Sequence, residues 1–138
     1  MSHFVSIKTK VRDRLALVRA LVRMGFSKDQ IEVCDAAREM SDYYGGKKMA
    51  NVIIRSRHSG IPSDIGFEKS KDGVYVAHVD EYKYSGGTHY NAAWQKKLYT
   101  YYGVEKAKME LDKQGHKIGV NYFEDVDEKE RPRLRVRL

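Results

Sequence analysis

The chain has 138 residues, carries a formal net charge of +7, and is 41% hydrophobic and 33% charged. This length predicts one compact domain over residues 1–138 with enough chain for a substantial core. No apolar run approaches the roughly 20 residues of a membrane-spanning helix, so we expect no membrane partner. The single cysteine, Cys34, cannot form an internal disulfide, and the N-terminus enters a strand-like pattern at once. Both features predict a cytoplasmic protein without a secretory signal.

The N-terminal segment predicts a strand followed by a helix. Alternating side chains over residues 3–10 are typical of a β-strand. Asp13 occupies the position of a helix N-cap, and apolar residues then recur at three- and four-residue spacing up to Met24. Gly25 is a natural stop signal for this helix.

The middle of the chain predicts one weak strand, three clearer strands and several turns. The pattern over residues 27–48 is weak, whereas residues 51–55 read as a buried strand. Two further strands, over residues 65–69 and 74–79, flank the sequence Asp72-Gly73, which is a favoured hairpin turn.

The C-terminal part predicts a long helix and a last pair of strands. Residues 91–114 show helical periodicity, with Gly103 as a point of division or kinking and Gly115 as the end. Residues 118–124 and 133–138 predict two strands joined by an acidic stretch. The expected fold is therefore α+β, an antiparallel sheet with two main helices packed on one face, in the order β-α-β-β-β-β-α-β-β.

Several short motifs resemble a known family. The opening MSHFVSIKTKVRD, the segments DIGF at 64–67 and DGVY at 72–75, and Tyr99 to Val104 carry the likeness. The chain resembles the hypothetical chloroplast open reading frame thirty-five family, an uncharacterised domain family of plastids, bacteria and phages. The resemblance implies a compact α+β protein and no established activity. The long charged turn from Glu124 to Arg131 departs from the short Asp-Gly hairpin typical of that family.

Basic residues provide the clearest functional signal. Arg12, Arg19 and Arg23 are spaced i, i+7, i+11, which places them on one sector of a helix. The last residues alternate between arginine and apolar side chains, so a strand there presents its arginines on one face and Leu134 and Val136 on the other. The candidate residues for binding nucleic acid or another anion are Lys8, Lys10, Arg12, Arg19, Arg23, Arg133, Arg135 and Arg137.

The alternatives differ in what these charges do. The five acids between Glu124 and Glu130 can pair with the terminal arginines across a hairpin, leaving only a solvated face. An acidic protein is the other candidate partner, through a protein-interaction module such as an accessory subunit or a phage-borne inhibitor of a host complex. A metal site around His78, Asp80 and His89 lacks the spacing of a zinc site.

No catalytic motif stands out, so enzymatic activity is the less favoured class, and neither a metal nor a cofactor is predicted. The leading hypothesis is a small non-enzymatic binding protein for nucleic acid or a nucleotide.

Overall fold

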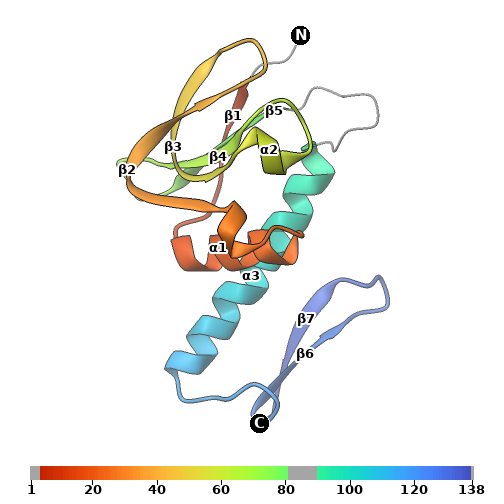
Figure 1. The fold of residues 1–138 in the computed structure, drawn as a ribbon. Helices are drawn as coiled ribbons and strands as arrows, with labels where there is room; N and C mark the ends of the chain where they lie inside the picture. The colour runs from red at the N-terminus through yellow and green to blue at the C-terminus, as the bar shows by residue number, and fades with distance from the viewer. Residues whose placement is uncertain (1–3, 81–89, 138) are drawn as a thin grey trace.

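The structure is a computed structural model that describes residues 4–80 and 90–137, and it has the predicted α+β architecture. A five-stranded antiparallel sheet, two main helices and a separate two-stranded hairpin follow the expected order (Figure 1). The elements are β1 (Phe4–Lys8), α1 (Arg14–Arg23), the 3₁₀ turn η1 (Lys28–Gln30), β2 (Glu32–Ser41), β3 (Lys47–Ile54), α2 (Ser56–Ser59), β4 (Ile65–Lys69), β5 (Tyr75–Asp80), α3 (Ala92–Lys113), β6 (Tyr122–Val126) and β7 (Pro132–Val136).

The large sheet has the strand order β1-β5-β4-β3-β2, and every neighbouring pair is antiparallel. Helices α1 and α3 cross each other on one face of this sheet (Figure 1). The main core lies between them, where Leu17 and Leu21 of α1 and Leu98 of α3 are fully buried together with Phe67 and Ala77 of the sheet. Burying such apolar surface is the main force that holds helices to a sheet.

Strands β1 and β7 are not neighbours. Strand β1 pairs with β5, whereas β7 pairs with β6 in a hairpin of its own. This hairpin lies beside α3, away from the large sheet (Figure 1). The N-terminal and C-terminal basic residues are therefore not brought together by strand pairing.

Local sequence signals explain several of the element boundaries. The Asp13 side chain accepts a hydrogen bond from the backbone N–H of Ala16 at 3.0 Å, which confirms its role as the N-cap of α1. Gly25 ends this helix with φ of +114°, a conformation that side chains disfavour. Gly73 adopts φ of +85° in the β4–β5 turn, as expected of the Asp-Gly sequence.

Helix α3 runs unbroken for 22 residues, so Gly103 neither divides nor ends it. The packing of its neighbours on the core offsets the weak helix propensity of this glycine. At the start of the helix the Asn91 side chain accepts a hydrogen bond from the backbone N–H of Trp94. Within the described residues no helix is long and apolar enough to cross a membrane.

Strands β2 and β3 are longer than the sequence pattern indicated. Register shifts between Val33 and Arg38, so a bulge interrupts the simple alternation that would reveal β2. A second, smaller core of Met40, Ala50 and Ile53 covers the sheet face opposite the helices.

Candidate anion-binding site

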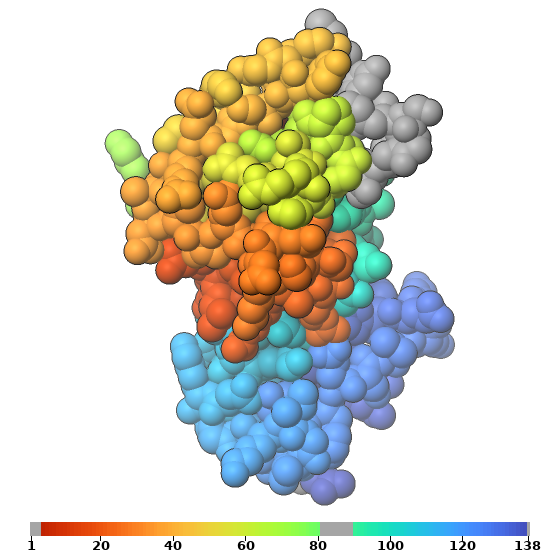
Figure 2. Space-filling model, viewed as in Figure 1, coloured from red at the N-terminus to blue at the C-terminus, as the bar shows by residue number. Residues whose placement is uncertain are grey.

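The structure distributes the eight predicted basic residues over different parts of the molecule. Lys8 and Arg12 contact the β4–β5 turn, which projects at the edge of the molecule (Figure 2). Lys10 lies between Thr9 and Val11, whose backbone groups bond to Tyr75 at the start of β5. The three terminal arginines lie on the β6–β7 hairpin instead. Arg19 and Arg23 belong to α1, whereas Arg12 precedes this helix, so the i, i+7, i+11 argument does not hold for Arg12.

The arginines of the hairpin share one face with an aspartate. The register places Asp125 directly opposite Arg133, and its carboxylate accepts from the guanidinium at 2.6 Å. Arg135 lies 3.4 Å from the same carboxylate. The hydrogen bond from Arg133 is the largest influence on the pKa of Asp125 and holds it below its ordinary value. Cross-strand charge pairing therefore occupies part of the arginine row.

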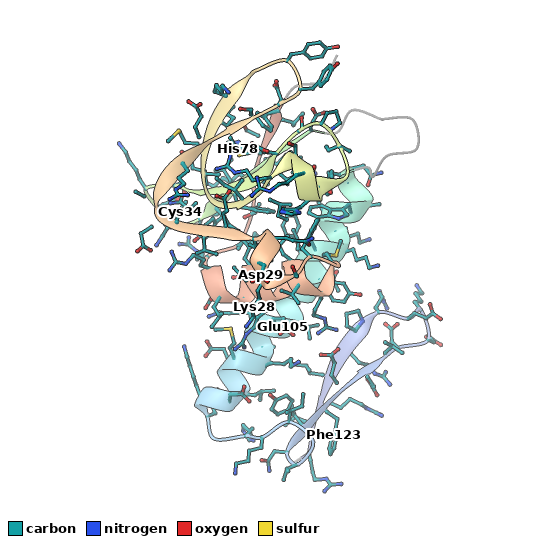
Figure 3. The ribbon with its side chains drawn as sticks, viewed as in Figure 1. Lys28, Asp29, Cys34, His78, Glu105 and Phe123 are labelled. Atoms are coloured by element: carbon teal, nitrogen blue, oxygen red, sulfur yellow. The ribbon has the colours of Figure 1, made fainter. Side chains whose placement is uncertain are left out.

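An aromatic contact involves the last member of the row. The Arg137 guanidinium lies over the Phe123 ring at 5.7 Å from its centroid. Figure 3 places Phe123 on the hairpin, far from the sheet that carries His78. Over residues 117–137 six cations face five acids, a net charge of only +1. The hairpin is thus close to neutral as a whole.

Arg23 is held in a network of charged side chains between α1, α3 and β6. Its guanidinium donates to Glu124 at 2.8 and 2.5 Å and to Glu105 at 3.1 Å. Lys108 approaches both acids, at 3.4 and 3.3 Å. The hydrogen bond to Glu124 is the main reason that the pKa of Arg23 lies above its ordinary value. Its guanidinium is engaged by two carboxylates and joins the hairpin to the helices.

Arg19 differs from Arg23 although both belong to α1. Its side chain is exposed and makes no ion pair within the part of the chain that the structure describes. It remains a free surface cation on its own.

Arg12 and Lys8 meet at the β4–β5 turn. The Arg12 guanidinium donates to the backbone carbonyl of Asp72 at 2.9 Å, and the Lys8 ammonium lies 3.8 Å from the Asp72 carboxylate. The backbone N–H of Arg12 donates to the hydroxyl of Tyr102 at 3.1 Å, which fixes the chain between β1 and α1. These contacts hold two predicted cations at one end of the sheet.

Two cavities of about 320 Å³ each open at this end of the sheet. The first is lined by Arg12, Arg14, Asp35, Asn51, Lys69 and Tyr75. The second is lined by Lys8, Ser70, Lys71, Asp72 and Val76. We call the cations around these cavities, together with the adjacent Lys10, the basic end: Lys8, Lys10, Arg12, Arg14, Lys69 and Lys71.

The bulge in β2 shapes the first cavity, and Asn51 holds the bulge in place. Its amide nitrogen donates to the backbone carbonyls of Cys34 and Asp35 at 3.1 and 3.0 Å. Its amide oxygen accepts from the backbone N–H of Lys69 at 2.9 Å. One side chain thereby ties the bulge to the end of β4, where Lys69 begins the turn.

The basic end carries a net positive charge. Six cations stand against two carboxylates, Asp35 and Asp72, which leaves a net charge of +4. Arg14 pairs with Asp35 at 2.8 Å, and this hydrogen bond lowers the pKa of Asp35. The Asp35 side chain is 94% exposed, so solvent screens this pair and an incoming anion can displace it.

Sequence reasoning missed half of the basic end. Arg14, Lys69 and Lys71 join the predicted Lys8, Lys10 and Arg12 only through the fold. The signal was present, because Lys71 lies in the turn predicted around Asp72-Gly73 and Lys69 comes just before it. Considering charges on predicted turns, and not only on strand and helix faces, would have identified both lysines as candidate binding residues.

The histidine cluster considered as a metal site has other partners. His78 is buried, and its Nδ1 and Nε2 lie 2.8 Å from the Ser6 hydroxyl and 2.9 Å from the Glu68 carboxylate. Asp80 accepts from the Ser63 hydroxyl at 2.8 Å. His89 lies outside the described residues. Among residues 4–80 and 90–137 no group of three His, Cys, Asp or Glu side chains could hold a metal ion.

Comparison with protein-family models, curated proteins and solved structures finds no match. The resemblance to the chloroplast open reading frame thirty-five family therefore stays a prediction, and the case for function depends on the geometry.

Proposed function

We propose that this protein binds nucleic acid through the basic end, by contacts to the phosphate backbone. The observation that carries the proposal is the net charge of +4 around two cavities at the same end of the sheet. A phosphate held there would meet the guanidinium groups of Arg12 and Arg14 and the ammonium group of Lys69. Guanidinium groups match phosphate geometry through paired N–H donors, and lysine adds a point charge.

The spread of the cations favours a polymer over a single small anion. Lys8 ends β1, Lys10 and Arg12 lie between β1 and α1, and Arg14 begins α1. Lys69 ends β4, and Lys71 lies in the β4–β5 turn. Charges on three segments and in two cavities suit successive phosphates of one strand. Recognition of this kind is independent of base sequence and steeply dependent on salt. We place this role in the cytoplasm, where Cys34 would stay reduced.

The test compares two triple variants with the same loss of charge. Lys10, Lys69 and Lys71 make no ion pair or side-chain hydrogen bond within the described residues, so replacing all three by glutamine leaves the core packing intact. The matched control, R133Q/R135Q/R137Q, removes three cations from the hairpin. Fluorescence anisotropy of labelled single-stranded RNA and duplex DNA measures affinity at about 50 and 200 mM salt.

We expect K10Q/K69Q/K71Q to weaken binding strongly and the hairpin control to change it little. For duplex DNA, the slope of log affinity against log salt should fall by about 0.9 for every phosphate that the variant no longer neutralises. Absence of binding by the unaltered protein at low salt contradicts the proposal. A larger loss of affinity in the hairpin variant would move the site to the terminal arginines.

A further inference from the structure

The outer edge of β7 is an unpaired strand edge. The hairpin contains two strands, and β7 pairs only with β6 among the described residues. Isolated two-stranded sheets are marginally stable in water, and an unpaired edge is a ready template for another strand. The chemistry of this edge indicates what it can accept.

The hydrogen-bond register shows which backbone groups of β7 point outward. The backbone N–H of Asp127 donates to the carbonyl of Arg131 at 2.9 Å, and that of Arg137 donates to Asn121 at 2.7 Å. Hydrogen-bonded pairs alternate along an antiparallel ladder, so the N–H and C=O groups of the arginine positions face β6. The backbone groups of Leu134 and Val136 therefore point away from β6.

The two edges of the hairpin differ. On β6 the outward carbonyl of Tyr122 accepts from the backbone N–H of Gly119 at 2.8 Å, so the preceding turn covers the first residue of that edge. On β7 the outward groups of Leu134 and Val136 have no hydrogen-bond partner within the part of the chain that the structure describes. Pro132 begins the strand and lacks an N–H group, which limits the free edge to the residues after it.

The side chains beside this edge favour a negatively charged partner strand. Arg133, Arg135 and Arg137 form a row on one face, which a single carboxylate of Asp125 partly neutralises. The other face is apolar at the free end, where the Val136 side chain is exposed. An added strand would meet cations on one face and an apolar surface on the other.

We propose that the outer edge of β7 binds an extended, acidic segment of a partner protein by strand addition. In such a segment acidic and apolar residues alternate, because successive side chains point to opposite faces. The acids would pair with the arginine row, and the apolar residues would lie along Val136. A second copy of this chain is a poor occupant, since two β7 strands would place their arginine rows side by side.

The first test uses the full-length protein and a labelled ten-residue peptide of alternating glutamate and valine. Val136→Pro removes an outward N–H that the hairpin itself does not use, and Val136→Thr keeps it. Loss of one hydrogen bond with its acceptor left unpaired should weaken peptide binding about tenfold or more in the proline variant. The threonine variant should bind within about twofold of the unaltered protein. Equal binding by both variants would overturn the proposal.

The second test measures the backbone amides of the unaltered protein, so it does not require a variant to fold. Hydrogen exchange by NMR should show slower exchange at the amides of Leu134 and Val136 when the glutamate peptide is present. A peptide with lysine in place of glutamate should not slow them. Failure of the glutamate peptide to slow these amides excludes strand addition at this edge.

A third arm separates a protein partner from nucleic acid. R133Q/R135Q/R137Q should lose peptide binding while it keeps nucleic-acid binding at the basic end. If instead this variant loses RNA binding and the peptide never binds, the arginine row serves nucleic acid and the proposal fails. The role of the basic end is judged separately by K10Q/K69Q/K71Q.

Discussion

Replacing Arg23 with alanine should destabilise the protein by about 2–3 kcal/mol. The side chains of Arg23, Glu105 and Glu124 are only 26%, 9% and 23% exposed. Removing one partner of a buried charge pair costs about 3–5 kcal/mol, whereas exposed pairs contribute about 0.2–1 kcal/mol. This network lies between those limits, and Lys108 remains to compensate part of the negative charge. The expected loss corresponds to a fall in Tm of roughly 10 °C.

The matched control is Arg19→Ala on the same helix. Arg19 is exposed and has no ion pair within residues 4–80 and 90–137, so its replacement should change the free energy of unfolding by less than about 0.5 kcal/mol. Chemical denaturation measures both variants. A double-mutant cycle with Glu124→Gln isolates the pair and should give a coupling of about 1–2 kcal/mol.

The loss of stability in Arg23→Ala should be concentrated in the β6–β7 hairpin. The network joins β6 to α1 and α3, as Glu105 on α3 illustrates in Figure 3. Hydrogen exchange in the hairpin should therefore accelerate more than exchange in the large sheet. Equal stabilities of Arg23→Ala and Arg19→Ala, or a coupling below about 0.5 kcal/mol, would refute the reasoning.

Three other changes test separate parts of the structure. Gly66→Ala should destabilise the protein by about 1–3 kcal/mol, because an added Cβ overlaps the Met40 sulfur and lies 2.8 Å from the Ala50 Cβ. Thermal unfolding measures this loss, and an unchanged Tm would contradict the packing. The hydrogen bond from Arg23 holds the pKa of Glu124 below its ordinary 4.5. The stability that this carboxylate contributes is therefore complete above pH 4.5 and is lost as the pH falls through the lowered pKa. The free energy of unfolding of Glu124→Gln should lack this part of the pH dependence. Asn51→Ala should lower the free energy of unfolding by about 2–3 kcal/mol and weaken RNA binding, since it removes three hydrogen bonds to the backbone around the first cavity. Unchanged RNA affinity would show that the bulge in β2 does not shape the binding site.

Local signals predicted much of the fold. The cap at Asp13, the glycine stop at Gly25 and the turn at Gly73 are each set by a few neighbouring residues, and all three are confirmed. Strand β2 is predicted only as a weak strand without clear bounds, because its bulge breaks the alternation of side chains. The expectation that Gly103 divides its helix is wrong because tertiary packing, which sequence does not display, overrides helix propensity.

The candidate site was harder to predict than the fold. Lys8, Lys10 and Arg12 lie in the basic end, but Lys69 and Lys71 join them only because β4 and β5 stand between β1 and β3. Arg23 resembles a surface cation in the sequence, since helical spacing cannot show that Glu124 of a distant strand will reach it. The pairing of Asp125 with Arg133 is among the alternatives that the sequence indicates, because a hairpin register follows from local sequence.

The pairing of β1 with β5 has a consequence for the kinetics of folding. Ser6 and His78 meet across this ladder although 72 positions separate them in the chain. Closing so long a loop costs entropy before any contact offsets it, and folding slows as the separation of contacting residues grows. We therefore expect β1 to dock late, after β2 to β5 have formed a hairpin series. Until then the edge of β5 stays open, and during synthesis this nascent sheet is most exposed to misassembly.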